Sequence, residues 1–163
     1  MAKNVKDEKT NVMRVLEQKG IPYTAHAYAH EEGVAVDGVT VANMLGQDPE
    51  QVFKTLVARG ASKGIYVFVI PVAESLDLKK AAKAVGEKSI EMVAVKEINA
   101  LTGYIRGGCS PVGMKKQYPT VFHETAEIID SIMVSAGKIG TQVELAPAAL
   151  MELVEGTMAD IVV

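Results

Sequence analysis

Two β-rich runs around one short loop constrain the fold of this chain more than any other feature of its sequence. Residues 52–58 and 65–70 are rich in β-branched and aromatic side chains, and the loop between them contains Gly60 and Gly64. Such runs, joined by a short glycine-containing loop, are typical of an antiparallel hairpin. The second run is apolar on both faces, which predicts a central strand of a sheet.

The remaining sequence alternates strands and short helices along 163 residues. Periodicity and capping residues predict helices at residues 8–19, 39–45, 78–85, 96–101 and 148–154. Extended or β-rich runs predict strands at residues 21–28, 90–95, 120–123, 131–135, 141–145 and 160–163. Because strands occur partly in hairpins and partly between helices, we expect an α+β fold. It should form a single domain, residues 1–163, with a curved, barrel-like mixed β-sheet flanked by helices.

The charge balance excludes one class of function. The formal net charge is −3 and the isoelectric point is near 5.6, whereas a stand-alone, non-specific nucleic-acid binder usually carries a large basic excess. The chain has one cysteine, Cys109, and no apolar run long enough to span a membrane. We therefore expect a cytoplasmic protein that does not enter a membrane, and we expect it to be a monomer.

Lys54 is the residue of the first run that needs an explanation. On a strand it shares a face with Leu56 and Ala58, whereas Thr55 faces the other way. A charged amine among apolar neighbours needs a carboxylate, an escape to solvent or an anionic ligand. Lys54 is therefore either a lysine near a sheet edge whose ammonium reaches water, or a cation that binds a phosphate or a polarised carbonyl. The backbone N–H of Thr55 could line the same site.

A second candidate is the glycine-rich segment 107–113, Gly-Gly-Cys-Ser-Pro-Val-Gly. Glycine lets backbone N–H groups approach a ligand without a Cβ in the way, so Gly107 and Gly108 could form an oxyanion hole or an anion-binding nest. On composition alone, a simple glycine- and proline-rich connection explains the segment better. The chain contains neither a Walker loop nor the dinucleotide-binding fingerprint.

The sequence shows no convincing protein nucleophile. Cys109 would need a nearby base with an orienting partner, and the contexts of His26, His30 and His123 indicate none. His26 and His30 would point the same way on a strand, but no third metal ligand is evident. We expect no metal and no cofactor, and we interpret Cys109 as a small, half-buried filler.

Tyr28 and Ser135 are weak candidates when each is taken alone. Tyr28 could stack on a base or donate into a pocket, or it could pack as an ordinary half-buried residue. Ser135 precedes the turn 136–140, where its hydroxyl could contact a ligand or bond the turn backbone.

In their order and spacing, these segments resemble the YbaK/EbsC-like aminoacyl-tRNA deacylases, relatives of the editing domain inserted in bacterial prolyl-tRNA synthetases. The resemblance extends from about residue 11 to residue 163. It rests on residues 19–23, 26–30, 53–56, 78–83, 102–104, 107–113, 134–138 and 144–147. The chain is most similar to the YbaK branch, which removes cysteine from tRNA(Pro) mischarged by prolyl-tRNA synthetase.

This resemblance implies a trans-editing deacylase for Cys-tRNA(Pro), with Cys-tRNA(Cys) as a further substrate and prolyl-tRNA synthetase as a partner. It implies that Lys54 is the essential lysine, that Tyr28 and Ser135 belong to the pocket, and that Gly107 is a backbone contact. The substrate's own thiol is implied to attack its ester carbonyl and to leave as a cyclic thiolactone. The donors to the oxyanion would then be Lys54 and the N–H groups of Gly107 and Gly108, unless Lys54 binds the phosphate of the terminal adenosine.

Two alternatives remain open at this point. The chain could be a related editing enzyme that removes alanine from Ala-tRNA(Pro) by attack of water. It could also be a module that binds aminoacyl-tRNA or a synthetase without catalysis, although Lys54 and the intact glycine segment argue against that.

Overall fold

A computed structural model describes residues 9–163, so the expected helix start at Glu8 lies outside the described residues. The helices are α1 (Asn11–Gln18), α2 (Gly38–Leu45), α3 (Leu78–Val85), α4 (Val95–Thr102), the 3₁₀ helix η2 (Glu124–Ile128) and α5 (Pro147–Val154). The strands are β1 (Thr24–Ala27), β2 (Phe53–Gly60), β3 (Ile65–Pro71), β4 (Ile90–Met92), β5 (Thr120–His123), β6 (Ile132–Ser135), β7 (Thr141–Leu145) and β8 (Thr157–Ala159). None of the helices in residues 9–163 is long and apolar enough to cross a membrane.

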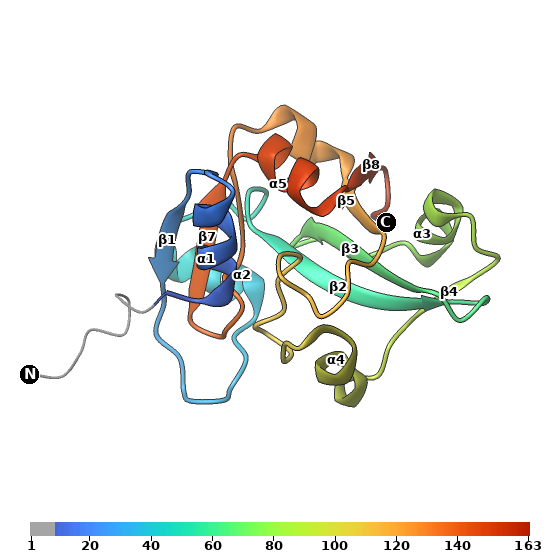
Figure 1. The fold of residues 1–163 in the computed structure, drawn as a ribbon, viewed down its shortest axis with the longest axis horizontal. Helices are drawn as coiled ribbons and strands as arrows, with labels where there is room; N and C mark the ends of the chain where they lie inside the picture. The colour runs from blue at the N-terminus through green and yellow to red at the C-terminus, as the bar shows by residue number, and fades with distance from the viewer. Residues whose placement is uncertain (1–8) are drawn as a thin grey trace, which may run out of the picture.

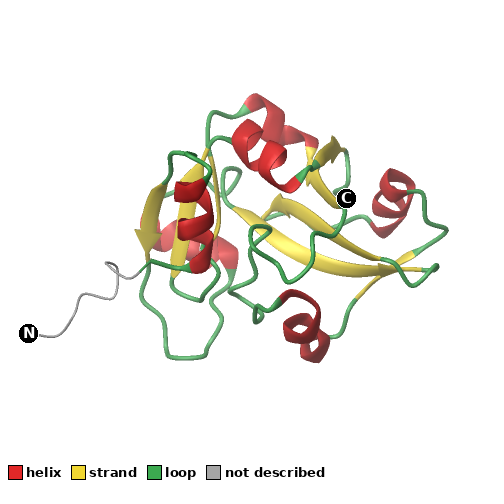
Figure 2. Cartoon of the chain, viewed as in Figure 1, coloured by secondary structure: helices red, strands yellow, loops and turns green. Residues whose placement is uncertain are grey.

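The strands form two sheets, shown in yellow in Figure 2. The small sheet has the order β1-β7-β6 and is antiparallel throughout, whereas the large sheet has the order β4-β2-β3-β5-β8. In the large sheet β5 runs parallel to both β3 and β8, so the sheet is mixed. A bridge between Val52 and Met133 links the two sheets. The expected α+β class with mixed strands is confirmed, but neither sheet closes into a barrel.

The hairpin expected from the two β-rich runs is confirmed. β2 and β3 pair antiparallel from Phe53 opposite Pro71 to Arg59 opposite Ile65. β3 lies between β2 and β5, which makes it the central strand of the large sheet, as its apolar sequence predicts. β2 continues to Gly60, whose N–H donates to the carbonyl of Gly64 at 2.9 Å, so the turn is shorter than the sequence indicated.

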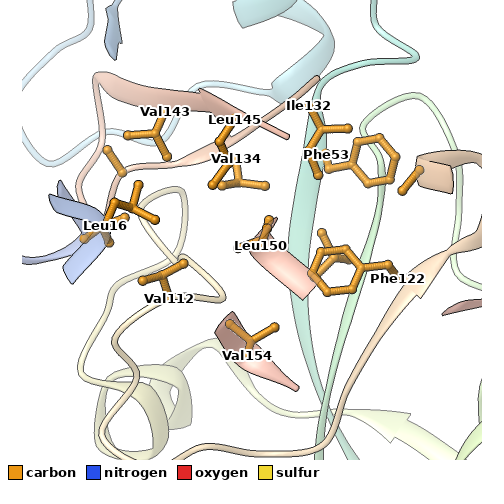
Figure 3. Close-up of a cluster of buried hydrophobic side chains, with 14 of the residues drawn as sticks. Leu16, Phe53, Val112, Phe122, Ile132, Val134, Val143, Leu145, Leu150 and Val154 are labelled. Carbon is orange, nitrogen blue, oxygen red and sulfur yellow. The ribbon is translucent and has the colours of Figure 1, made fainter. Parts of the chain in front are cut away.

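The main core lies between one face of the large sheet and one face of the small sheet (Figure 3). Helices α1 and α5 close it, with Leu16 and Leu150 fully buried among Phe53, Phe122 and Val143. Helix α3 covers the other face of the large sheet, and α2 packs against the other face of the small sheet (Figure 1). Each sheet therefore packs against the other sheet on one face and against a helix on its other face.

The helix boundaries follow local capping. The side chain of Asp77 accepts hydrogen bonds from the N–H groups of Lys79 and Lys80, each at 3.0 Å, and thereby starts α3. Gly86 ends the same helix in the left-handed conformation, which suits a residue without a Cβ. In α1 the side chain of Thr10 accepts from the N–H of Met13, so the helix begins later than the periodicity alone predicted.

Two strand predictions need correction. β4 ends at Met92 rather than at residue 95, because Val95 already begins α4. The predicted last strand at residues 160–163 is wrong: β8 precedes it, and Val162 forms only an isolated bridge with Leu76. Its apolar residues indicated burial correctly, since Ile161 is fully buried, but burial alone does not require a strand partner.

Glu144 joins all three strands of the small sheet. Its carboxylate on β7 accepts from the Ser131 hydroxyl, next to β6, at 2.5 Å. The other carboxylate oxygen lies 2.8 Å from Nε2 of His26 on β1. The hydrogen bond from Ser131, followed by that from His26, lowers the pKa of Glu144.

We expect Glu144→Gln to lower the free energy of unfolding by about 1 kcal/mol near neutral pH. Because the folded pKa of Glu144 is lowered, its contribution is present above the ordinary carboxyl value of 4.5 and is lost as the pH falls through the folded pKa. The difference in unfolding free energy should therefore vanish in acid. Urea unfolding at neutral pH and at a pH below the folded pKa of Glu144 will measure it. Glu127→Gln, at an exposed carboxylate, is the control and should change stability by less than about 0.5 kcal/mol. An equal penalty for Glu144→Gln at both pH values would contradict this interpretation.

Candidate active site

A cavity of about 630 Å³ lies where the start of β2, the start of α2, the glycine-rich segment and the β6–β7 hairpin meet. Every site residue expected from the sequence lines it except Gly108. The expected residues that line the cavity are Tyr28, Lys54, Thr55, Gly107 and Ser135. They come from four separate segments of the chain, so the fold brings together what the sequence disperses.

Lys54 occupies an open part of β2. On one side it pairs with Ile70 of β3, but on the other side β4 pairs with β2 only at Ala58–Gly60. The side chain is half-buried, and this burial lowers the pKa of Lys54, while the charges of Asp37 and Glu74 act in the opposite direction. Among residues 9–163 no carboxylate lies within salt-bridge distance of its ammonium. The lysine is therefore both near a sheet edge and part of the cavity wall.

The backbone of Thr55 points its N–H toward this same open edge. The carbonyl of Val52 accepts from the N–H of Val72, and the N–H of Gly60 donates to the carbonyl of Gly64, so both residues bond toward the β3 side of the hairpin. Since such bonds alternate along an antiparallel pair, the odd-numbered residues of β2 direct their N–H groups away from β3. The carbonyl of Val57 obeys this rule, because it accepts from Val93 at 3.2 Å. β4 does not reach Thr55, and the hydroxyl of Thr55 is buried without a partner among the described residues.

Gly107 forms another part of the cavity wall, where two loops approach closely. Its φ of 84° is in the left-handed region, and a Cβ placed there would lie 2.6 Å from the Cβ of Ala35. Glycine is therefore required for the contact as well as for the backbone conformation. Within the described part of the chain, its N–H has no hydrogen-bond acceptor. Arg106 lines the cavity beside it and adds a second cation.

Gly108 has a different position from the one expected. It does not line the cavity, and its N–H donates to the carbonyl of Ile105 at 3.0 Å. A Cβ on Gly108 would lie 3.0 Å from the N of Ile139 and from the Cα of Lys138. Gly108 thus packs the glycine-rich segment against the β6–β7 turn, and its N–H is already occupied in this structure.

Backbone hydrogen bonds hold Tyr28 and Ser135 at the cavity. The N–H of Tyr28 donates to the carbonyl of Gly140 at 2.9 Å, just beyond the end of β1. The hydroxyl oxygen of Ser135 accepts from the N–H of Gly137 at 3.1 Å, so its own proton remains available for a ligand. Ser135 therefore both bonds the turn and lines the cavity.

The described part of the cavity contains no nucleophile with a base beside it. Cys109 lines the wall, but burial raises the pKa of its thiol to about 11, so the thiol is neutral at physiological pH. None of the histidines lines the cavity: His26 bonds to Glu144, His30 lies edge-on to Tyr28, and His123 is buried. Within residues 9–163 no group of three residues is placed to hold a metal ion.

Sequence reasoning missed Asp37, Arg106 and Gln142 as lining residues. Asp37 caps α2, since its side chain accepts from the N–H of Thr40 at 3.2 Å. Gln142 lies directly opposite Ser135 in the β6–β7 register. The sequence predicts a hairpin with its turn at residues 136–140, and pairing residues outward from that turn would have placed Gln142 near Ser135.

One sequence relative is named as a tRNA deacylase, and one structural neighbour is described as a trans-editing enzyme. The chain is 49% identical, over 99% of its length and 98% of the relative, to the "Putative Cys-tRNA(Pro)/Cys-tRNA(Cys) deacylase EbsC" of Enterococcus faecalis. A crystal structure of "a putative trans-editing enzyme for prolyl tRNA synthetase" superposes with a TM-score of 0.81 at 25% identity, covering 93% of this chain and 94% of that one. The fold is also shared with the hypothetical protein APE2540, at a TM-score of 0.82 and 22% identity over 93% of this chain and 99% of that one.

The family described as "Aminoacyl-tRNA editing domain" matches residues 33–153. This match spans α2 to α5 and includes most of the residues that line the cavity. On the extent of this match and on the identity to EbsC, the chain belongs to the aminoacyl-tRNA editing domain family.

Proposed function

We propose that this chain is a trans-editing deacylase that removes cysteine from Cys-tRNA(Pro), with Cys-tRNA(Cys) as a further substrate. The observation that supports this most is the cavity itself. It combines Lys54 and the N–H of Gly107, which has no acceptor among the described residues, with no nucleophile–base pair in its described part. Such a site suits a reaction in which the substrate supplies the nucleophile. The family of the chain and the name of its 49% identical relative point to the same ester.

The proposed reaction is an intramolecular displacement. The Sγ of the cysteinyl group forms a bond with its own ester carbon, and the ester C–O bond breaks. The thiol proton ends on the ribose oxygen that leaves, so tRNA and a cyclic thiolactone are the products. The protein has to hold the thiol near the carbonyl carbon and to stabilise the charge that develops on the carbonyl oxygen.

Lys54 and the N–H groups of Thr55 and Gly107 are the proposed donors for this charge. All three residues line one cavity, and the N–H of Gly107 has no acceptor among the described residues. Removing a single donor of this kind typically costs about 10²–10³ in rate. Lys54 could alternatively bind the phosphate of the terminal adenosine, which would affect KM more than kcat.

The thiol requirement adds a chemical selection to the selection by size. A cavity that admits cysteine also admits alanine, because binding discriminates poorly between small side chains. Alanine has no group that can attack its own ester. Discrimination against alanyl esters therefore follows from the mechanism even without a specific contact.

Prolyl-tRNA synthetase is the proposed partner, and the cytoplasm is the proposed compartment. With a net charge of −3, the chain lacks the basic excess that would hold tRNA without help. A synthetase that releases mischarged tRNA(Pro) would supply both the substrate and the selectivity for that tRNA. We propose that the chain itself is a monomer.

We expect Lys54→Ala to abolish deacylation of Cys-tRNA(Pro) while the fold survives, because the side chain is only half-buried and carries no packing of the main core. Initial rates with radiolabelled Cys-tRNA(Pro), together with circular dichroism, measure both properties. Lys88→Ala removes the same charge from an exposed position outside the cavity and is the matched control. A folded Lys54→Ala protein with full activity would refute the assignment of the site.

Side by side deacylation of Cys-tRNA(Pro) and Ala-tRNA(Pro) separates the candidate functions. We expect turnover of the cysteinyl ester and little turnover of the alanyl ester, since only cysteine can cyclise. Activity on the alanyl ester alone would instead identify an enzyme that uses water. Failure on both esters would indicate a binding module.

We expect Cys109→Ser to retain most of the activity, because a neutral, buried thiol has no part in the proposed reaction. The measurement is kcat/KM for Cys-tRNA(Pro), with a thermal unfolding curve to verify the fold. Loss of turnover in a normally folded variant would show that the protein supplies the nucleophile.

A further inference from the structure

Gln142 is a buried amide at the cavity with only half of its hydrogen-bonding capacity used. The residue is 5% exposed and lines the cavity from β7, directly opposite Ser135. Its Oε1 accepts a hydrogen bond from Nε2 of Gln47 at 2.9 Å. No described residue accepts from its Nε2, and this atom is accessible rather than enclosed by protein. The donor end of the amide is therefore open to the cavity.

The backbone of Gln47 is held in place, and its side chain bonds to Gln142 through Nε2 while its Oε1 is enclosed without a partner among the described residues. Gln47 follows Gly46, which ends α2, and its own N–H donates to the carbonyl of Ala42 at 2.8 Å. The other end of α2 lines the cavity at Gly38, where a Cβ would lie 2.4 Å from a methyl of Val72. Gln47 does not line the cavity, so it can influence a ligand only through Gln142.

The direction of the amide decides what it can bind. With Oε1 occupied by Gln47, Gln142 presents N–H groups, which suit an oxygen that is neutral or gains negative charge. The reverse orientation would present a carbonyl oxygen, which suits an ammonium group. Because Nε2 is accessible from the cavity, its N–H groups are free to donate to a ligand acceptor there.

We propose that Gln142 binds the substrate by donating from Nε2 to the carbonyl oxygen of the aminoacyl ester, and that Gln47 is a positioning residue that sets the direction of this amide. The proposal rests on the deacylase function above. It adds a donor from the small sheet to those that the large sheet and the glycine-rich segment provide. Since the carbonyl oxygen gains charge in the reaction, the contact should strengthen in the transition state.

Gln47→Glu tests the direction of the amide. A carboxylate can only accept, so Gln142 would turn its Nε2 toward Glu and its Oε1 toward the cavity. Gln47→Met, of similar size, removes the hydrogen bond without imposing a direction. We expect kcat on Cys-tRNA(Pro) to fall in the order wild type, Gln47→Met, Gln47→Glu, with a loss of about 10–100-fold for the last and a smaller change in KM.

Stability measured on the same samples separates positioning from a structural role. If kcat of the two Gln47 variants follows their unfolding temperatures instead of the order above, the positioning role is wrong. Gln142→Met and Gln142→Glu provide a second test, and both should lower kcat. Unchanged or increased activity of Gln142→Glu would show that the cavity needs an acceptor and would overturn the proposal. Wild-type protein that does not deacylate Cys-tRNA(Pro) would instead refute the proposed function itself.

Discussion

The site depends on one incomplete strand pairing. β4 pairs with β2 only at Ala58–Gly60, and β6 bridges to the chain only at Val52, just before β2, so the residues between have no continuous strand partner on that side. An exposed edge of this kind normally invites pairing with another chain. Here α2, the glycine-rich segment and the β6–β7 hairpin surround it and convert it into one wall of a cavity. Lys54 and Thr55 owe their availability to this missing neighbour.

Close packing of glycine residues fixes other segments around the cavity. Gly107 packs on Ala35, Gly108 packs on the backbone of Lys138 and Ile139, and Gly38 packs on Val72. Each contact leaves no room for a Cβ, so the loops can shift little without losing it. The amide pair of Gln47 and Gln142 adds a polar link between α2 and the small sheet. These contacts can hold the hydrogen-bond donors of the cavity in place even where the donors do not pack in the main core.

Local signals in the sequence predicted most of the elements, because caps and hairpins are decided within a few residues. Helix α3 spans the predicted residues 78–85 between Asp77 and Gly86, and the β2–β3 pairing follows from two runs and their loop. The separation into two sheets and the position of β8 were missed, since both depend on partners distant in the chain. At the site, Lys54 was anomalous by itself, whereas Gln142 carried no local signal. Its place in the site depends on Ser135, opposite it in the hairpin, and on Gln47, which follows α2.

The burial of Cys109 has a consequence for the survival of the enzyme during turnover. A thiolactone is an acylating agent, and a thiolate in the same cavity would capture it and leave the protein blocked. With the pKa of Cys109 raised to about 11, only roughly one thiol in ten thousand is ionised at neutral pH. Under the proposed mechanism, the site can therefore contain a cysteine and release the thiolactone without modifying itself.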